Sequence, residues 1–551
     1  MLKKFFILQT DKINRFLSLF RKNNWAQIAV IFGSLLIFAG LSLAVFLFSL
    51  NSFLFLAQYP ETSQPIIIYS LAVTFILSFL LVFVSAIVAS LGGLFQREDN
   101  ILLFSLPIET AIIFESRLID IIILSSWPIF IFAVPLVFGF SKAFKMSLTS
   151  SFVFLAGLLF LTVFANLLGI VSSLLISQFA RIGKKSKILR IAALISLPLI
   201  AGALIKFLLP NQLLDNLESL TVEQITWLLR HQTLMAKYLP TTWLVEVIFY
   251  WDKNLSPVLA GFFRLTFSIL VISFLTSQLR KKFYLRSVSQ TMEGRFIAGP
   301  QDITPGKYRS FPYILKGKMG ALTEKDWLLI FRSPGQFFQL LFIVFLQILY
   351  FLIISRLPVN RIGYLFPFWY KNQLVALNLL FANYLASILA MRFFFPMISL
   401  EGQSSWIVWS SPLPRIKLFW QKFISSFLLL LAWLTTSTFF AAAVFKIAFF
   451  SQWQLFLINL PVSLTITAIT LGMGAIKPNF WEKNPEKLST NPGGILATTV
   501  CLVYNGLISL VLFYQKDLFS PARQLFIWSV SLLIILPIFY QVAKRINKYQ
   551  I

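Results

Sequence analysis

Long apolar runs separated by short polar segments dominate the pattern along the chain. The runs occupy residues 26–57, 66–95, 118–140, 147–179, 188–209, 256–278, 336–356, 372–395, 423–444, 455–475, 495–514 and 525–542. Each can form an α-helix that crosses the apolar core of a bilayer, which needs about 20 residues. The pattern therefore predicts an all-α polytopic membrane protein with about 12 transmembrane helices. It does not fit a β-barrel, whose strands alternate over about 10 residues.

Two polar stretches interrupt this pattern and suggest how the chain is organised. Near the start, Ile13, Phe16, Leu17 and Phe20 share one helical face, which predicts an amphipathic helix lying in the membrane interface. Between the sixth and seventh runs, Gly-Pro and Pro-Gly pairs punctuate an irregular linker. The predicted parts are an N-terminal interfacial helix at 1–25, a six-span half at 26–282 with an external loop at 210–255, a cytoplasmic linker at 283–323, and a second six-span half at 324–551.

A charged segment after the second run of each half has the same pattern in both halves. The first elbow is residues 96–120 and the second elbow is residues 401–424. Aligning Pro107 with Pro412 without a gap also places Ser105 on Ser410, Phe114 on Phe419 and Arg117 on Lys422. The match indicates an internal duplication. Because each half has an even number of spans, the two halves are expected to have parallel topology.

The distribution of charge orients the chain. It carries 47 Lys and Arg against 20 Asp and Glu, a net charge of +27, and most of the basic residues fall in alternate polar segments. By the positive-inside rule, this predicts a cell-membrane protein with both termini in the cytoplasm rather than a nucleic-acid-binding protein. A single cysteine, Cys501, excludes an intramolecular disulfide, and a single histidine, His231, leaves no cluster of metal ligands.

No catalytic motif stands out in the sequence. It contains no G-x-x-x-x-G-K-[ST] phosphate loop, no H-E-x-x-H and no G-x-S-x-G. The expectation is therefore a transport subunit without nucleotide-binding or catalytic motifs. Asp120, Lys206 and Arg264 lie in or at the ends of apolar runs, and each is interpreted as snorkelling to an interface. The lack of an obvious mid-membrane carboxylate argues against a transporter driven by an ion gradient.

Several short motifs together resemble one family. An interfacial helix ends in Phe-Arg at residues 20–21 and again at 331–332. Each half then has two spans and a Ser-x-Pro-[Ile/Leu] elbow with a basic residue ten positions after the proline. Residues 472–494 supply a Pro-, Asn- and Gly-bearing cytoplasmic loop. This arrangement is similar to the membrane subunits of ABC transporters, in the exporter permease class with six spans per half.

That resemblance implies a separate ATPase subunit that holds ATP and magnesium and docks on the elbows on the cytoplasmic side. The docking candidates that it implies are Glu98, Asp99, Pro107, Glu109, Arg117, Glu401, Pro412, Arg415 and Lys422. The second elbow departs from the first, because Gln403 and Ser404 replace the Glu98–Asp99 pair. No residue is assigned to cargo or to a metal, and the 61 phenylalanines suggest an amphipathic or lipid-like cargo only weakly.

Two other functions are compatible with a twelve-span chain. A secondary transporter driven by an ion gradient is the first alternative, although the first elbow has an acidic rather than a Gly-rich start. A membrane-embedded enzyme or glycan flippase is the second, although His, Asp and Glu are rare within the runs. Neither alternative explains the paired elbows.

Overall fold

The protein divides into two compact units of helices. The computed structural model describes residues 10, 25–58, 60–95, 99–179, 239–251, 255–289, 318–332, 334–355, 369–404, 414–445, 449–482, 485–489, 491–514 and 521–546. The first unit comprises Met1–Ile28, Leu35–Ala193 and Lys206–Ile303, and the second comprises Ala29–Ser34, Leu194–Ile205 and Thr304–Ile551. The principal boundary between them falls within the predicted linker. No strand occurs among the described residues, so the predicted helical class is confirmed for them.

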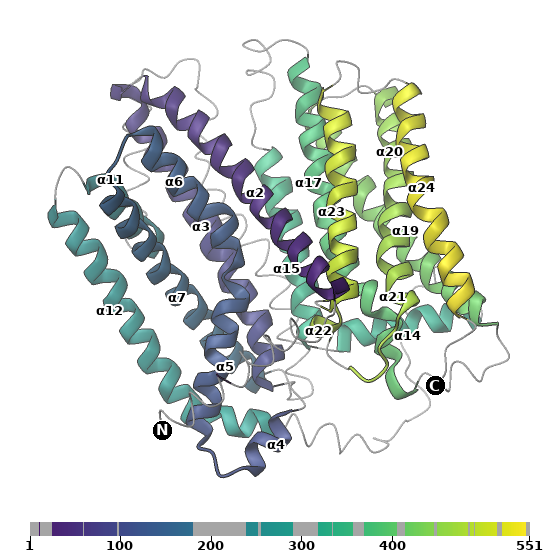
Figure 1. Cartoon of the computed structure of the whole chain (residues 1–551), viewed down its shortest axis with the longest axis horizontal. Coiled ribbons are helices and arrows are strands. Elements are labelled where there is room, and N and C mark those ends of the chain that lie inside the picture. The colour runs from purple at the N-terminus through teal and green to yellow at the C-terminus, as the bar shows by residue number, and fades with distance from the viewer. Residues whose placement is uncertain are drawn as a thin grey trace. The chain divides into compact units, whose positions relative to one another are not determined.

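The first unit is a bundle of long apolar helices. Its elements are α2 (Trp25–Ala57), α3 (Pro60–Ser90), η1 (Leu91–Phe95), α4 (Asp99–Ser105), α5 (Thr110–Ser125), η2 (Ile129–Ala133), α6 (Val134–Ala143), α7 (Leu148–Phe179), α11 (Pro240–Tyr250), α12 (Leu255–Leu279) and η4 (Arg280–Tyr284). Helices α3, α7, α11 and α12 pack against one another (Figure 1). Phe75, Phe154, Leu158 and Leu244 are fully buried where they meet.

The third predicted span is broken rather than continuous. Thr110–Ser125 and Ile129–Ala143 are bent by 41° relative to each other. Pro128 lies at the break, where its ring and missing N–H prevent a regular helix from continuing. Asn166 of α7 hydrogen-bonds to the side chains of Ser125 and Ser126 at this point. The polar contacts therefore satisfy the side chains that the bend brings into the apolar interior.

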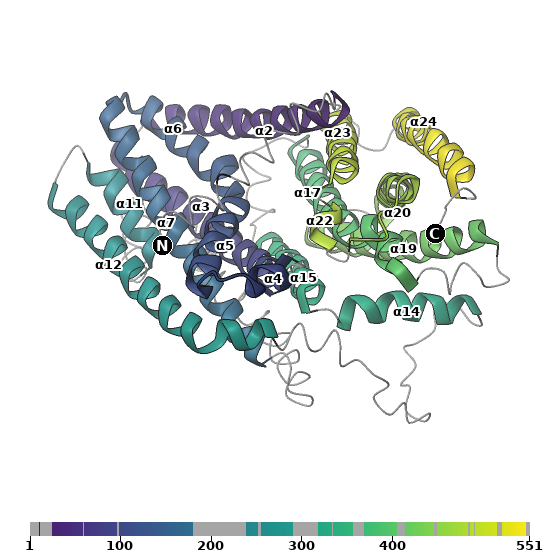
Figure 2. The ribbon, with the colours of Figure 1, turned by 60° about the horizontal axis from the view of Figure 1, so that its bottom comes forward.

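The second unit repeats the helical organisation with its own core. Its elements are α14 (Lys318–Arg332), α15 (Pro334–Ser355), α17 (Trp369–Phe393), η5 (Phe395–Met397), η6 (Ser399–Ser404), α19 (Arg415–Val444), α20 (Phe449–Thr467), η7 (Ala468–Gly472), α21 (Met473–Ile476), α22 (Pro485–Ser489), α23 (Pro492–Tyr514) and α24 (Pro521–Ile546). Helix α17 packs against α19 and α23, and α20 packs against α19 and α24 (Figure 2). Leu379, Ala386, Leu430 and Ile466 lie in the core of this unit.

The predicted number of spans is confirmed only in part. Among the described residues, eight helices are long and apolar enough to cross a membrane, or up to nine if the bent pair counts as one span. The run at 188–209 lies outside the described residues, as do all residues of the interfacial helix at 1–25 except Thr10 and Trp25. The predicted external loop at 210–255 contains a helix, α11 (Pro240–Tyr250), with Pro240 in its first turn, where a proline is well tolerated. The total of twelve spans and the exact division into halves stay predictions.

Close packing of α3 against α7 generates a first testable prediction. A Cβ on Gly169 would lie 2.6 Å from Cβ of Ala86 and 2.8 Å from the carbonyl oxygen of Phe83. Gly169→Ala is therefore expected to push the two helices apart and to lower the free energy of unfolding by about 1–3 kcal/mol. Thermal unfolding of the purified protein in detergent measures the change.

The matched control for this experiment is Gly506→Ala on α23. A Cβ there has no atom within 4 Å, so the variant is expected to unfold at or above the wild-type temperature. Equal stability of Gly169→Ala and the wild type would contradict the proposed close approach of α3 and α7.

Candidate functional site: the charged elbows

The second elbow begins with a sharp turn at the end of α17. The chain leaves that helix through η5 and η6, which are short 3₁₀ segments, and reaches Gly402 at φ 58° and ψ −147°. Only glycine adopts this combination without strain, because a Cβ would clash with the backbone. The turn places the Glu401 side chain inside the protein, where it is 8% exposed.

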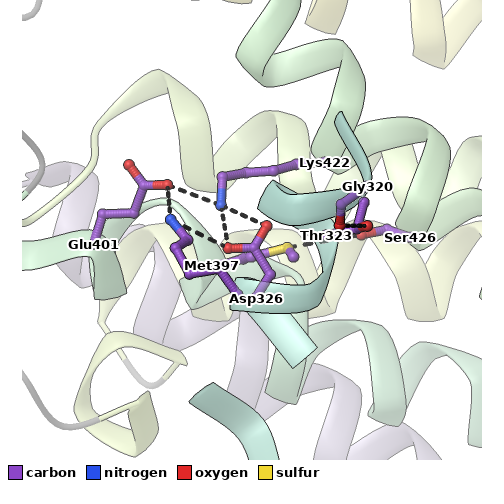
Figure 3. A network of polar contacts seen from close by, with 8 residues as sticks. Gly320, Thr323, Asp326, Met397, Glu401, Lys422 and Ser426 are labelled. Atoms are coloured by element: carbon purple, nitrogen blue, oxygen red, sulfur yellow. Dashed lines mark hydrogen bonds and ion pairs between the residues drawn. The ribbon is translucent and has the colours of Figure 1, made fainter. Parts of the chain in front are cut away.

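Four charged side chains from three elements meet at this turn. Lys422 Nζ of α19 lies 2.9 Å from Asp326 Oδ1 of α14 and 2.9 Å from Glu401 Oε1 of η6. Lys325 Nζ of α14 lies 3.2 Å from the same Glu401 oxygen and 3.5 Å from Asp326 Oδ1. Figure 3 shows the Lys422 amine between the two carboxylates. This charged cluster thus joins the interfacial helix, the elbow and the following span.

The charged cluster is buried except on its Lys325 side and is internally neutral. The side chains of Lys422, Asp326 and Glu401 are 7%, 3% and 4% exposed, whereas Lys325 is 37% exposed. Two positive and two negative charges cancel, so the burial of each charge is offset by a close partner. Removing one partner from such an arrangement is costly because the remaining charge stays buried. The cluster therefore holds its three elements in one mutual arrangement.

A later segment, within residues 472–494, contacts the chain just before the second elbow. The backbone N–H of Asn479 donates to Ser399 Oγ of η6 at 3.1 Å. The hydroxyl of Ser489 in α22 donates to the carbonyl of Met391 near the end of α17, also at 3.1 Å. These contacts place residues of the 472–494 stretch, which the sequence singled out for its Pro, Asn and Gly content, against the end of α17 and the start of η6, directly before the second elbow.

The first elbow has a simpler version of the same ion pair. Arg117 of α5 is 4% exposed, and its Nη2 donates to Asp99 Oδ2 at the start of α4 at 2.7 Å. Its Nη1 lies 4.0 Å from Asp120 Oδ2. In each elbow, a buried basic residue on the helix after the proline binds an acidic residue before the proline. The aligned positions Arg117 and Lys422 therefore make the same type of contact within their own units.

Aromatic packing holds the first elbow against the end of α12. Tyr284 is 1% exposed, and its ring lies 5.1 Å from that of Phe114 and 6.0 Å from that of Phe104, measured between centroids. Arg280, four residues earlier, donates from Nη1 to Glu115 Oε1 at 3.1 Å. The first unit thus adds ring packing and a partly exposed ion pair to the Arg117–Asp99 contact of its elbow.

The structure separates the predicted docking residues into two groups. Asp99, Pro107 and Glu109 are exposed and Arg415 is half-buried, while Arg117, Glu401 and Lys422 are buried in ion pairs of this chain. Glu98 and Pro412 lie outside the described residues. Docking of an ATPase on these residues stays a prediction, and the buried group would act by holding the elbow in place.

Sequence reasoning missed two members of the charged cluster, Lys325 and Asp326. In their helix, α14, the sequence pattern drew attention only to the Phe-Arg pair at 331–332. The sequence offered one indication of a role for Asp326, which is an acidic residue directly before Trp327 on an otherwise amphipathic helix. Its partner, Lys422, lies 96 positions later, a separation at which sequence spacing carries no information about contact.

An ion pair inside the first unit revises the interpretation of Arg264. Its Nη1 donates to Glu246 Oε2 of α11 at 3.0 Å. Arg264 therefore has a carboxylate partner from a short buried helix, rather than solvent alone. Asp120 lies beside Arg117, and Lys206 is outside the described residues.

The fold defines a helical, polytopic membrane protein, and a family comparison goes further. Residues 24–540 match the family model described as "Putative ATP-binding cassette". The match covers most of the chain, so the protein belongs to this ATP-binding cassette family. A search of curated proteins and a search of solved structures gave no significant match.

The family match corrects one expectation from the sequence. A transport subunit without nucleotide-binding or catalytic motifs was expected because the phosphate loop pattern is absent. The ATP-binding cassette family points to nucleotide binding in this chain, so that expectation is wrong. The physical reason is that the phosphate loop is only one local pattern that binds a nucleotide. Nucleotide phosphates can also be bound by basic side chains and backbone N–H groups brought together from distant segments.

The charged cluster generates a second prediction. Lys422→Met leaves two buried carboxylates with only the half-exposed Lys325, and is expected to lower the free energy of unfolding by about 3–5 kcal/mol. Adding Glu401→Gln to this variant removes the excess negative charge and is expected to recover part of the loss. Thermal unfolding of the purified proteins in detergent measures both effects.

The control is Lys417→Met on the first turn of the same helix. Lys417 is exposed, so the variant removes one positive charge without touching the charged cluster and is expected to unfold like the wild type. If Lys422→Met and Lys417→Met unfold at the same temperature, the charged cluster does not stabilise the second unit.

Proposed function

We propose that this protein is the permease of an ATP-driven ABC exporter. In this proposal, two fused six-span halves form the transmembrane pathway in the cell membrane, with both termini in the cytoplasm. Membership of the ATP-binding cassette family and the eight long apolar helices among the described residues support an ABC-type role in a membrane. The permease role and the direction of transport are the finer parts of the proposal.

The observation that carries the proposal is the ion pair common to both elbows. Arg117 with Asp99 and Lys422 with Glu401 each link the beginning of an elbow to the helix that follows it. Each pair includes a buried basic residue, at aligned positions in two segments about three hundred residues apart. A loop that only connected two helices could leave its charged side chains in solvent, where ion pairs contribute little to stability. Here the basic residue of each pair is buried instead.

The geometry allows an elbow to transmit force to its span. A displacement applied to the exposed part of the first elbow reaches α5 through the Asp99–Arg117 pair as well as through the backbone. In the second elbow, a displacement reaches α19 through Glu401 and Lys422, and α14 through Asp326. Packed, paired elements of this kind move as units between discrete arrangements rather than deforming gradually.

In this proposal, ABC ATPase subunits on the cytoplasmic side supply the displacement. They bind ATP with magnesium, and their closure would press on the elbows and switch the two halves between inward-open and outward-open states. Asp99, Pro107 and Glu109 form the exposed part of the first elbow that such a subunit would contact. The cargo is a small molecule, lipid or peptide of unspecified chemistry.

Charge reversals at the exposed Glu109 and the half-buried Arg415 test the proposal. Glu109 is exposed and caps no backbone group with its side chain, so Glu109→Lys is expected to leave the fold intact. Combined with Arg415→Glu on the second elbow, it is expected to reduce co-purification of an ATPase from native membranes about tenfold, as expected for loss of one or two charge-assisted contacts. Quantitative mass spectrometry of the purified complex measures this ratio.

The matched control is Lys544→Glu, which reverses an exposed charge at the end of α24, away from the elbow residues in the chain. It is expected to leave co-purification unchanged. If the elbow variant retains its ATPase, or if cargo movement in vesicles follows an ion gradient without ATP, the proposal is wrong. The second result would support the secondary-transporter alternative.

A further inference from the structure

A half-exposed ion pair lies inside the first unit, away from the elbows. Glu246 is on α11, a short helix whose neighbouring residues Leu244, Val247 and Ile248 are fully buried. Arg264 is on α12, which packs closely on α11, since a Cβ on Gly261 would lie 2.9 Å from the carbonyl oxygen of Trp243. This contact fixes the two charged side chains next to each other.

The depth of the pair follows from the length of α12. Arg264 lies sixteen residues before the basic cluster that begins at Arg280, and a helix rises by about 1.5 Å per residue, so about 24 Å separate the two levels. Basic clusters mark one membrane surface, and the apolar core is about 30 Å thick. Arg264 is therefore about 6 Å inside the opposite surface, close to the level of the lipid headgroups.

The exposure of the pair distinguishes it from the charged cluster. The side chains of Arg264 and Glu246 are 35% and 28% exposed. Of the five N–H donors of the Arg264 guanidinium, the described part of the chain engages one, through Nη1 to Glu246. An ion pair that served only to neutralise buried charge would be enclosed, as Lys422 and its partners are. This pair still presents a cationic and an anionic group outward.

The surface around the pair is apolar. Phe267, Val271 and Phe274 follow Arg264 on the same face of α12, towards the centre of the membrane, and are 59%, 42% and 64% exposed. At this depth, such a face suits acyl chains, and the adjoining pair of opposite charges suits a headgroup that carries both signs. A phosphate accepts hydrogen bonds from guanidinium donors, and a primary ammonium donates to a carboxylate.

We propose that Arg264 and Glu246 form a binding site for the headgroup of phosphatidylethanolamine, with Arg264 on the phosphate and Glu246 on the ammonium. The acyl chains lie along Phe267, Val271 and Phe274 of α12. The site discriminates against phosphatidylcholine, because a quaternary ammonium has no N–H to donate to Glu246. This assignment rests on the first unit alone and does not depend on the proposed export function.

Native mass spectrometry of the purified full chain with added lipid tests the site. Phosphatidylethanolamine and phosphatidylcholine with identical acyl chains are the probes. The wild type is expected to retain phosphatidylethanolamine about tenfold better, as one charge-assisted hydrogen bond would give. Arg264→Gln is expected to weaken binding of both lipids. Glu246→Gln is expected to abolish the preference while leaving binding through the phosphate.

The control uses the other Arg–Glu pair of this unit. Arg280→Gln breaks the contact with Glu115, at 3.1 Å, and is expected to leave the lipid preference intact. If Arg264→Gln does not yield folded protein, the isosteric Glu246→Gln decides, because a purely structural pair predicts no change in headgroup selectivity. Equal retention of the two lipids by the wild type, or an unchanged preference in Glu246→Gln, would overturn the proposal.

Discussion

A charge that leaves water inside an apolar protein must have a partner close by, and both elbows show this constraint. The buried charged residues Arg117, Asp326, Glu401 and Lys422 each lie in an ion pair. Lys422 shows the constraint most clearly, with two carboxylates within 2.9 Å of its amine. Because a lone charge there would cost several kcal/mol, the positions of α14, the elbow and α19 are tied to one another.

The same constraint explains why the elbow is a defined structure rather than a loose connection. The second elbow must turn tightly enough to direct Glu401 inward, which the backbone of Gly402 permits. Residues from the 472–494 stretch then cover the turn through Ser399 and Met391. The result is a turn that contacts from α14, α19 and the 472–494 stretch hold in place. A docking surface that passes movement to a membrane helix would need such support at its base.

Sequence patterns predicted the features that depend on local order. Apolar runs located most of the helices. The alignment of the two elbows identified Arg117 and Lys422 as equivalent positions. Patterns could not identify partners far apart in the chain, such as Asp326 for Lys422. The sequence pattern predicted a continuous span at 118–140 and not the break at Pro128, because apolar residues lie on both sides of this proline. Glu246 was placed in an external loop because the run around it is short, and only tertiary packing shows that α11 is buried.

The two elbows also differ in a way that bears on how they would work. Asp99 is 52% exposed beside the buried Arg117, so ions and water reach the first pair and weaken it. The second cluster is enclosed on all but the Lys325 side, which leaves its interactions largely unscreened. A stiff second elbow and a softer first elbow would respond differently to the same applied force. The two elbows thus share one type of ion pair, and the difference in burial of their acidic partners makes them unequal.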